Sequence, residues 1–189
     1  MIKLSPCQLV MLTGILLSPS TFATDINVDF TATVKATTCN ITLTGTNVTD
    51  NKNNKYTLVI PSMGMDKIAN KTVQSEANFK LVAIENTCSS GISWIDTTLT
   101  GNQFGNSTLI IPLDSDTTST TRNIGMGFKR KATSGDTFLK PNGAEYIRWS
   151  ASEISTDGLE MTVALRETTT GQGVPGKFRA LATFNFSYQ

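Results

Sequence analysis

Apolar residues recur along this chain in short segments of strand length. They either alternate with polar residues or form brief continuous runs, and stretches rich in Gly, Asn, Asp and Ser separate them. The segments are Ile26–Leu43, Tyr56–Ile60, Phe79–Ile84, Ile92–Leu99, Leu109–Leu113, Ile124–Lys129, Glu145–Trp149, Leu159–Leu165 and Phe178–Tyr188. Many short strands at this spacing predict an antiparallel β-sandwich. A short helical turn is expected within Ala69–Glu76.

The composition agrees with this pattern, because 30 of the 189 residues are threonine. The branched Cβ of threonine disfavours helices and packs well on a pleated sheet. We therefore expect a nearly all-β chain. Neither an internal repeat nor an interdomain linker is visible, and the length suits one domain with a real core.

The first residues have the pattern of a secretory signal peptide. A positive start (Met1–Lys3) precedes an apolar run (Leu9–Leu17), and Thr21-Phe22-Ala23 resembles a cleavage site. The apolar run is shorter than the ~20 residues that a membrane-spanning helix needs. The alternative is a retained anchor. We expect residues 1–23 to be removed, which leaves 166 residues beginning at Thr24.

Removal of residues 1–23 changes the cysteine count and the charge. Cys7 and Lys3 are lost, which leaves Cys39, Cys88, 15 basic residues and 15 acidic residues. A single cysteine pair in an exported chain predicts a disulfide, with two free buried thiols as the alternative. Zero net charge argues against nucleic acid as a partner.

Candidate chemistry is sparse. The chain has no histidine, which removes Ser-His-Asp and Cys-His catalysis and the usual zinc or copper centres. No catalytic residue, metal site or cofactor is predicted. Asp114 and Asp116 are expected in a solvated loop, and Lys129–Lys131 at a solvated strand end. The G-x-G-x-x-G match over Gly171–Gly176 contains Pro175 and precedes a strand pattern, so we interpret it as a loop.

The two tryptophans, Trp94 and Trp149, each lie in an apolar segment. Their rings could stack on sugars, but core positions are the commoner use of such residues. We therefore expect both in the core.

The two ends of the expected mature chain carry the clearest period-two patterns. Near the start, apolar residues occupy every second position, at Ile26, Val28, Phe30, Ala32 and Val34. Such a segment is a one-faced strand. At the other end, Phe178, Ala180, Ala182, Phe184, Phe186 and Tyr188 alternate with largely polar residues. The residues alone leave open whether these are ordinary strands of the domain's own sheets.

Both ends resemble those of pilin subunits from chaperone–usher fimbriae of the type 1 kind. The run Ile26–Val34 followed by Ala36-Thr-Thr-Cys39 resembles the family's extension and first cysteine. The ending resembles its C-terminal signature, with Tyr188 next to last and Gly176 fourteenth from the end. The resemblance divides the chain into a signal peptide (1–23), a donor-strand extension (24–36) and a pilin domain (37–189).

This resemblance implies an all-β fold, an incomplete immunoglobulin-like β-sandwich that a neighbouring subunit's donor strand completes. Ile26, Val28, Phe30, Ala32 and Val34 would be the donor face. The acceptor groove, first occupied by a chaperone strand, would lie beside Gly176, Phe178, Ala180, Ala182, Phe184, Phe186 and Tyr188.

The implied partners are other pilin subunits, a periplasmic chaperone, an outer-membrane usher, and a host or abiotic surface receptor. The chain would be exported through the periplasm to the cell-surface fimbrium, where it would support adhesion and biofilm formation. The alternatives are a receptor-binding minor tip subunit of the adhesin type and an exported hydrolase. The hydrolase lacks a visible catalytic constellation.

Overall fold

The computed structural model of this chain describes residues 24–31 (backbone only), 39–84, 87–88 and 92–189. The expected signal peptide and the expected donor positions Ala32 and Val34 lie outside the described residues. The strands are β1 (Thr24–Thr31), β2 (Asn40–Thr44), β3 (Val48–Asp50), β4 (Lys55–Met63), β5 (Glu76–Ile84), β6 (Ile95–Gly101), β7 (Ile124–Arg130), β8 (Asn142–Arg148), β9 (Leu159–Glu167) and β10 (Leu181–Tyr188). The short helices are α1 (Met65–Ala69), η1 (Val73–Ser75) and η3 (Glu153–Asp157).

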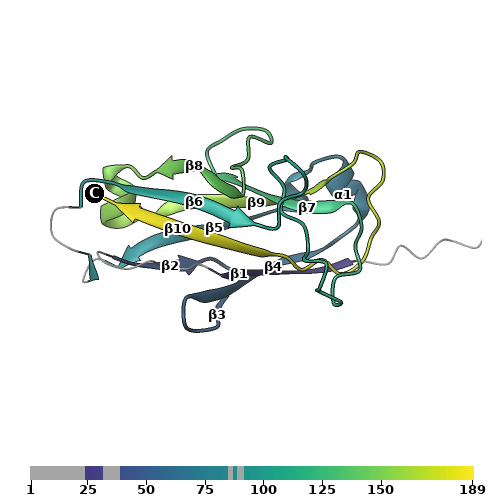
Figure 1. The fold of residues 1–189 in the computed structure, drawn as a ribbon, viewed down its shortest axis with the longest axis horizontal. Coiled ribbons are helices and arrows are strands. Elements are labelled where there is room, and N and C mark those ends of the chain that lie inside the picture. Colours follow the sequence, from purple (N-terminus) through teal and green to yellow (C-terminus); the bar gives the residue numbers. More distant parts are fainter. Residues whose placement is uncertain (1–23, 32–38, 85–86, 89–91) are drawn as a thin grey trace, which may run out of the picture.

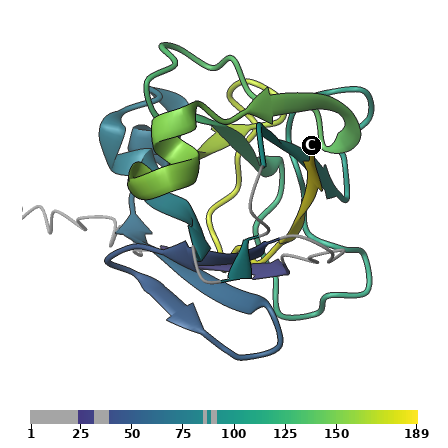
Figure 2. The same ribbon diagram turned by 90° about the vertical axis from the view of Figure 1, so that its left-hand side faces the viewer.

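These strands form two packed sheets (Figure 1). The first has six strands in the order β3-β4-β1-β10-β6-β8, and the second has four in the order β2-β5-β9-β7. Strand pairs within the sheets are antiparallel, except that β1 runs parallel to β10. Figure 2 views the molecule from the end where the C-terminus lies, with the β3–β4 hairpin projecting below. The prediction of a mostly β chain with antiparallel sheets is confirmed.

The core lies between the sheets and follows from the alternation of apolar residues. Three phenylalanines meet at its centre: Phe79 on β5, Phe128 on β7 and Phe184 on β10. Their ring centroids are 5.4–6.1 Å apart, and the two contacts of Phe128 are edge-on. Such aromatic pairs add about 0.5–1.5 kcal/mol each beyond burial. The strand that ends the chain is thereby tied to the opposite sheet.

A second, smaller apolar cluster covers the outer face of the four-stranded sheet. It consists of Leu109, Phe138 and Ala164. Phe138 lies in the loop between β7 and β8 and packs on Gly127, where an added Cβ would come within 2.5 Å of its ring. Glycine at this position lets the loop approach the strand closely. As a result β7 is buried on both faces.

Several segment predictions differ from the structure in informative ways. Leu109–Leu113 is not a strand, because Ile110 alone bridges to Met126 and Pro112 has no amide hydrogen to continue a ladder. The last strand begins at Leu181 rather than Phe178, since Lys177 and Arg179 hydrogen-bond to the 119–121 segment instead. One strand, β3, lies in the polar stretch between the predicted segments Ile26–Leu43 and Tyr56–Ile60, and it pairs with β4.

The helical turn expected within Ala69–Glu76 is present as η1, and a further short helix, α1, precedes it. α1 covers Met65–Ala69 and η1 covers Val73–Ser75, so the helical residues lie on both sides of Asn70–Thr72. Lys71 between them has a positive φ of 53°, and this left-handed residue interrupts the helix.

The predicted disulfide is confirmed, because Cys39 and Cys88 are bonded with a sequence separation of 49. In the chain-entropy model, a disulfide that closes a loop of this length stabilises the folded state by roughly 4 kcal/mol. The bond joins the residue before β2 to the segment after β5. Within the described ranges, no helix has the length and apolar character that crossing a membrane would need.

Candidate functional site beside the C-terminal strand

The N-terminal strand lies between two strands that come from distant parts of the chain. β1 pairs antiparallel with β4 along its length and parallel with β10 at Asp29↔Leu181 and Phe30↔Ala182. In the antiparallel register, Ile26, Val28 and Phe30 lie opposite Ile60, Leu58 and Tyr56, respectively. Those three β4 residues are each at most 5% exposed. The apolar residues at every second position of β1 thus lie opposite the buried residues of β4.

The two edges of β10 are used very differently. On one edge, β10 pairs with β6 from Ala182 to Tyr188. On the other, the described residues pair only Leu181 and Ala182, both with β1. This second edge of β10 is the one that faces the N-terminal strand β1. A strand edge of this kind is a template for pairing with another strand.

The predicted groove residues fall into two groups. Ala182, Phe184 and Phe186 lie on β10 with side chains 0%, 1% and 6% exposed, so they form its inner face. Phe178 and Ala180 are also buried but precede the strand. The structure thus brings the β10 residues together along one side of the strand and places the other two at its start.

Gly176 lies before the strand at a point of close backbone approach. A Cβ at this position would come within 2.7 Å of the Thr120 carbonyl carbon and 2.8 Å of the Thr121 nitrogen. Next to it, the Lys177 amide donates to Thr120 Oγ1 at 2.8 Å, and the Thr120 amide donates to the Lys177 carbonyl at 2.8 Å. Glycine therefore allows the 119–121 segment to anchor the chain just before β10.

Tyr188 ties the end of β10 to the start of the described domain. Its hydroxyl donates to the Cys39 carbonyl at 3.1 Å. Burial raises the pKa of Tyr188 to about 12. The next residue, Gln189, accepts from the Trp94 amide and donates to its carbonyl. The disulfide and the C-terminal end of the chain thus lie close together, at the residue where the N-terminal segment joins the domain.

A buried ionic network lies on the outer face of the four-stranded sheet. The Arg166 guanidinium, on β9, donates to Asp136 at 2.8 Å, Ser75 at 2.8 Å and Glu76 at 2.6 Å. Lys129 pairs with Glu76 at 3.7 Å. The expectation of a solvated strand end at Lys129 is wrong, because its side chain is 8% exposed under the Phe138 loop. No sequence motif links these scattered residues.

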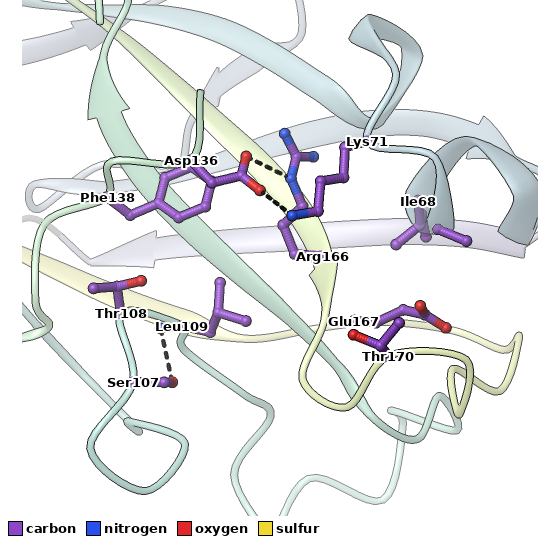
Figure 3. Close-up of a pocket in the computed structure, with 11 residues that line it drawn as sticks. Ile68, Lys71, Ser107, Thr108, Leu109, Asp136, Phe138, Arg166, Glu167 and Thr170 are labelled. Atoms are coloured by element: carbon purple, nitrogen blue, oxygen red, sulfur yellow. Dashed lines mark hydrogen bonds and ion pairs between the residues drawn. The ribbon is translucent and has the colours of Figure 1, made fainter. Parts of the chain in front are cut away.

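Asp136 receives two cations, as Figure 3 shows: Arg166 and Lys71, whose Nζ lies 3.0 Å from Oδ2. Burial acts to raise the pKa of this carboxyl, but hydrogen bonds from Lys71 and Arg166 outweigh it and lower the pKa below 3.8. The described residues contain no group of three or more His, Cys, Asp or Glu that is placed to bind a metal ion.

The lowered pKa gives a testable pH dependence. Because the folded-state pKa of Asp136 lies below its unfolded value, its contribution to stability is present above that unfolded value and is lost as pH falls through the folded one. We expect Asp136→Asn to reduce the loss of unfolding free energy as the pH falls below about 4, the ordinary pKa of an aspartate. Denaturant titrations at several pH values measure this loss, with the exposed Asp114→Asn as the control. Equal acid sensitivity in the wild type and Asp136→Asn would refute it.

The two tryptophans differ in how deeply they are buried. Trp149 is buried, and its Nε1 donates to Thr97 Oγ1 at 2.7 Å. The expected core position of Trp94 is wrong, because its ring is partly exposed and stacks on the Arg148 guanidinium, 4.4 Å from the ring centroid. Arg148 is held by a two-pronged ion pair with Asp96.

Comparison with known proteins places this arrangement in a family. Residues 28–189 match the family described as "Fimbrial protein". The chain is also 71% identical over 191 residues to the "Uncharacterized fimbrial-like protein YadM" of Escherichia coli (strain K12), a match that covers 100% of both chains. The matched range includes the second half of β1 and all of β10. The chain therefore belongs to the fimbrial protein family, whose members are structural, non-enzymatic components of surface fimbriae.

Proposed function

We propose that this chain is a structural subunit that polymerises by donor-strand exchange. The extension 24–36 of one subunit enters the groove beside β10 of its neighbour. Ile26, Val28, Phe30, Ala32 and Val34 form the inserted face. Domain 37–189 is an immunoglobulin-like sandwich that the inserted strand completes. This mode of recognition is β-augmentation, in which backbone hydrogen bonds give affinity and alternate side chains give selectivity.

The position of β1 beside β10 is the observation that carries the proposal. β6 covers one edge of β10 from Ala182 to Tyr188, and the N-terminal strand β1 lies along the other edge, in register with Leu181 and Ala182. Backbone amides and carbonyls of a buried strand need hydrogen-bond partners. The slot between β4 and β10 thus accepts a strand of the N-terminal sequence, and in the proposed polymer the extension of a second subunit takes this place.

The positions of the ends support a linear polymer. The N-terminal segment joins the domain at Cys39, beside the last residues of β10. The acceptor groove lies along β10 itself. Donor and acceptor are therefore different surfaces of one subunit, so the contact is heterologous. A heterologous contact that does not close produces an open fibre.

The energy of strand insertion is sufficient for stable assembly. Five apolar side chains, four of them large, contribute on the order of 10 kcal/mol as an upper estimate, at ~1.5–3 kcal/mol for each large one. Backbone hydrogen bonds along β10 add to this.

Export of the subunit follows the same proposal. Residues 1–23 direct it to the periplasm, where a chaperone strand occupies the groove. At the outer-membrane usher the extension of the next subunit replaces the chaperone, and the fibre reaches the cell surface. There it supports adhesion and biofilm formation.

Deleting Thr24–Ala36 tests the donor role. The shortened subunit should still accept a synthetic peptide of residues 24–36 from the wild type but should not donate to a second subunit. Gel electrophoresis without boiling separates strand-linked dimers from monomers and measures both activities. Donation by the shortened subunit would end the assignment of this segment as the donor.

A further inference from the structure

The surface cavity drawn in Figure 3 has no part in the proposed polymerisation. Its walls come from four separate parts of the chain: the α1 region, the loop before Ile110, the β7–β8 loop and the end of β9. The cavity has a volume of about 240 Å³. Sites for drug-sized ligands are roughly 300–1,000 Å³, so this one suits a single ring.

The floor of the cavity is preformed and mostly buried. Phe138 is 6% exposed and Leu109 is 9% exposed, and both belong to the outer apolar cluster. The Arg166 guanidinium beside them is fixed by Asp136, Ser75 and Glu76. A ligand entering here meets apolar carbons next to a rigid polar group, and little ordering cost remains.

The walls are also held by hydrogen bonds. The Leu109 amide donates to Ser107 Oγ at 3.1 Å, which shapes the loop on one side. On the other, the Glu167 carboxylate accepts from the Gly171 and Gly173 amides at 2.9 Å each. By contrast, the hydroxyls of Thr108 and Thr170 make no hydrogen bond with any residue that the structure describes. They are available to a ligand.

The charges around the cavity favour a neutral ligand. Lys71 and Arg166 line it with Asp136 and Glu167, so the lining carries two charges of each sign. Lys71 and Arg166 are both paired with Asp136. A charged ligand would have to displace these pairs or be desolvated without a partner, at considerable cost. Hydroxyl groups instead use the donors and acceptors already at the rim.

We propose that this cavity binds one neutral sugar residue. The ring carbons of the sugar would lie against Leu109 and the small part of Phe138 that faces the cavity, and its hydroxyls would pair with Thr108, Thr170 and Lys71. The inference is independent of strand exchange, since the cavity lies on the outer face of the four-stranded sheet, whereas β10 belongs to the six-stranded one.

Saturation-transfer NMR on subunit purified from bacteria expressing the full chain tests this proposal. The probes are glucose, galactose, mannose and N-acetylglucosamine, with glucuronic acid and glucosamine as charged comparisons. At least one neutral sugar should receive saturation. Thr108→Val/Thr170→Val should weaken its binding about tenfold or more, because two hydrogen bonds are lost. No transfer to any neutral sugar, or transfer to the charged sugars only, would overturn the proposal.

A blocking variant locates the binding. Ala69 is exposed on the cavity lining at the end of α1, so Ala69→Trp should abolish transfer. Ala151→Trp, also at an exposed position but outside this cavity, should keep it. Undiminished transfer to Ala69→Trp would place the sugar elsewhere and refute the site. Loss of fibres in Ala69→Trp cells would also refute it, by assigning the cavity to a second copy of the chain.

Discussion

A subunit carrying Phe30→Asp should fail to enter fibres. Phe30 lies in register with two buried residues, Tyr56 on β4 and Ala182 on β10. In the proposed polymer it is one of the large inserted side chains. Its replacement removes ~1.5–3 kcal/mol of burial and adds the desolvation of a carboxylate, several kcal/mol in real proteins. Together these weaken the contact by on the order of a thousandfold or more.

Electron microscopy of fibres and immunoblots of sheared surface material measure this effect. The periplasmic fraction should still contain the variant subunit, because in the proposed pathway the chaperone binds the groove and not the extension. Asn27→Asp is the matched control. It introduces the same carboxylate three residues earlier, opposite Val59, whose side chain is 40% exposed. Fibres of normal length from Phe30→Asp, or equal loss from Asn27→Asp, would contradict the insertion of this face.

Arg166→Leu should lower the free energy of unfolding by about 3–5 kcal/mol, the usual cost of breaking a buried ion pair from one side. The change leaves the Glu76 and Asp136 carboxylates without their shared guanidinium. It also leaves the Ser75 hydroxyl without its donor. Leucine fills part of the volume but offers no hydrogen bond.

Chemical denaturation of the purified subunit measures this change. Arg122→Leu removes an exposed arginine and should change the free energy by no more than about 0.5 kcal/mol. A loss below about 1 kcal/mol for Arg166→Leu would mean that the network adds little to stability.

The sequence predicted the strands and the disulfide because these depend on local patterns. Alternation over Leu159–Leu165 and the pairing of Cys39 with Cys88 needed no knowledge of distant neighbours. Leu109–Leu113 is not a strand, since Ile110 is a fully buried core residue that makes single bridges and has no ladder of its own.

Other features depend on contacts between remote residues and could not be predicted. The basic run Lys129–Lys131 predicts a solvated strand end, but the Phe138 loop covers Lys129 and Glu76 pairs with it. The sequence also left open whether Ile26–Val34 is a strand of its own sheet. In the structure β1 lies between β4 and β10 of the same chain.

The disulfide acquires a mechanical meaning if subunits are linked as proposed. Tension along the fibre would then reach each domain through its extension, at Cys39. The first strand after this residue, β2, lies at the edge of its sheet. An edge strand pulled from one end can be peeled away one hydrogen bond at a time. The Cys39–Cys88 bond transfers the load covalently to the chain just after β5, an interior strand, so that β2 is relieved of it.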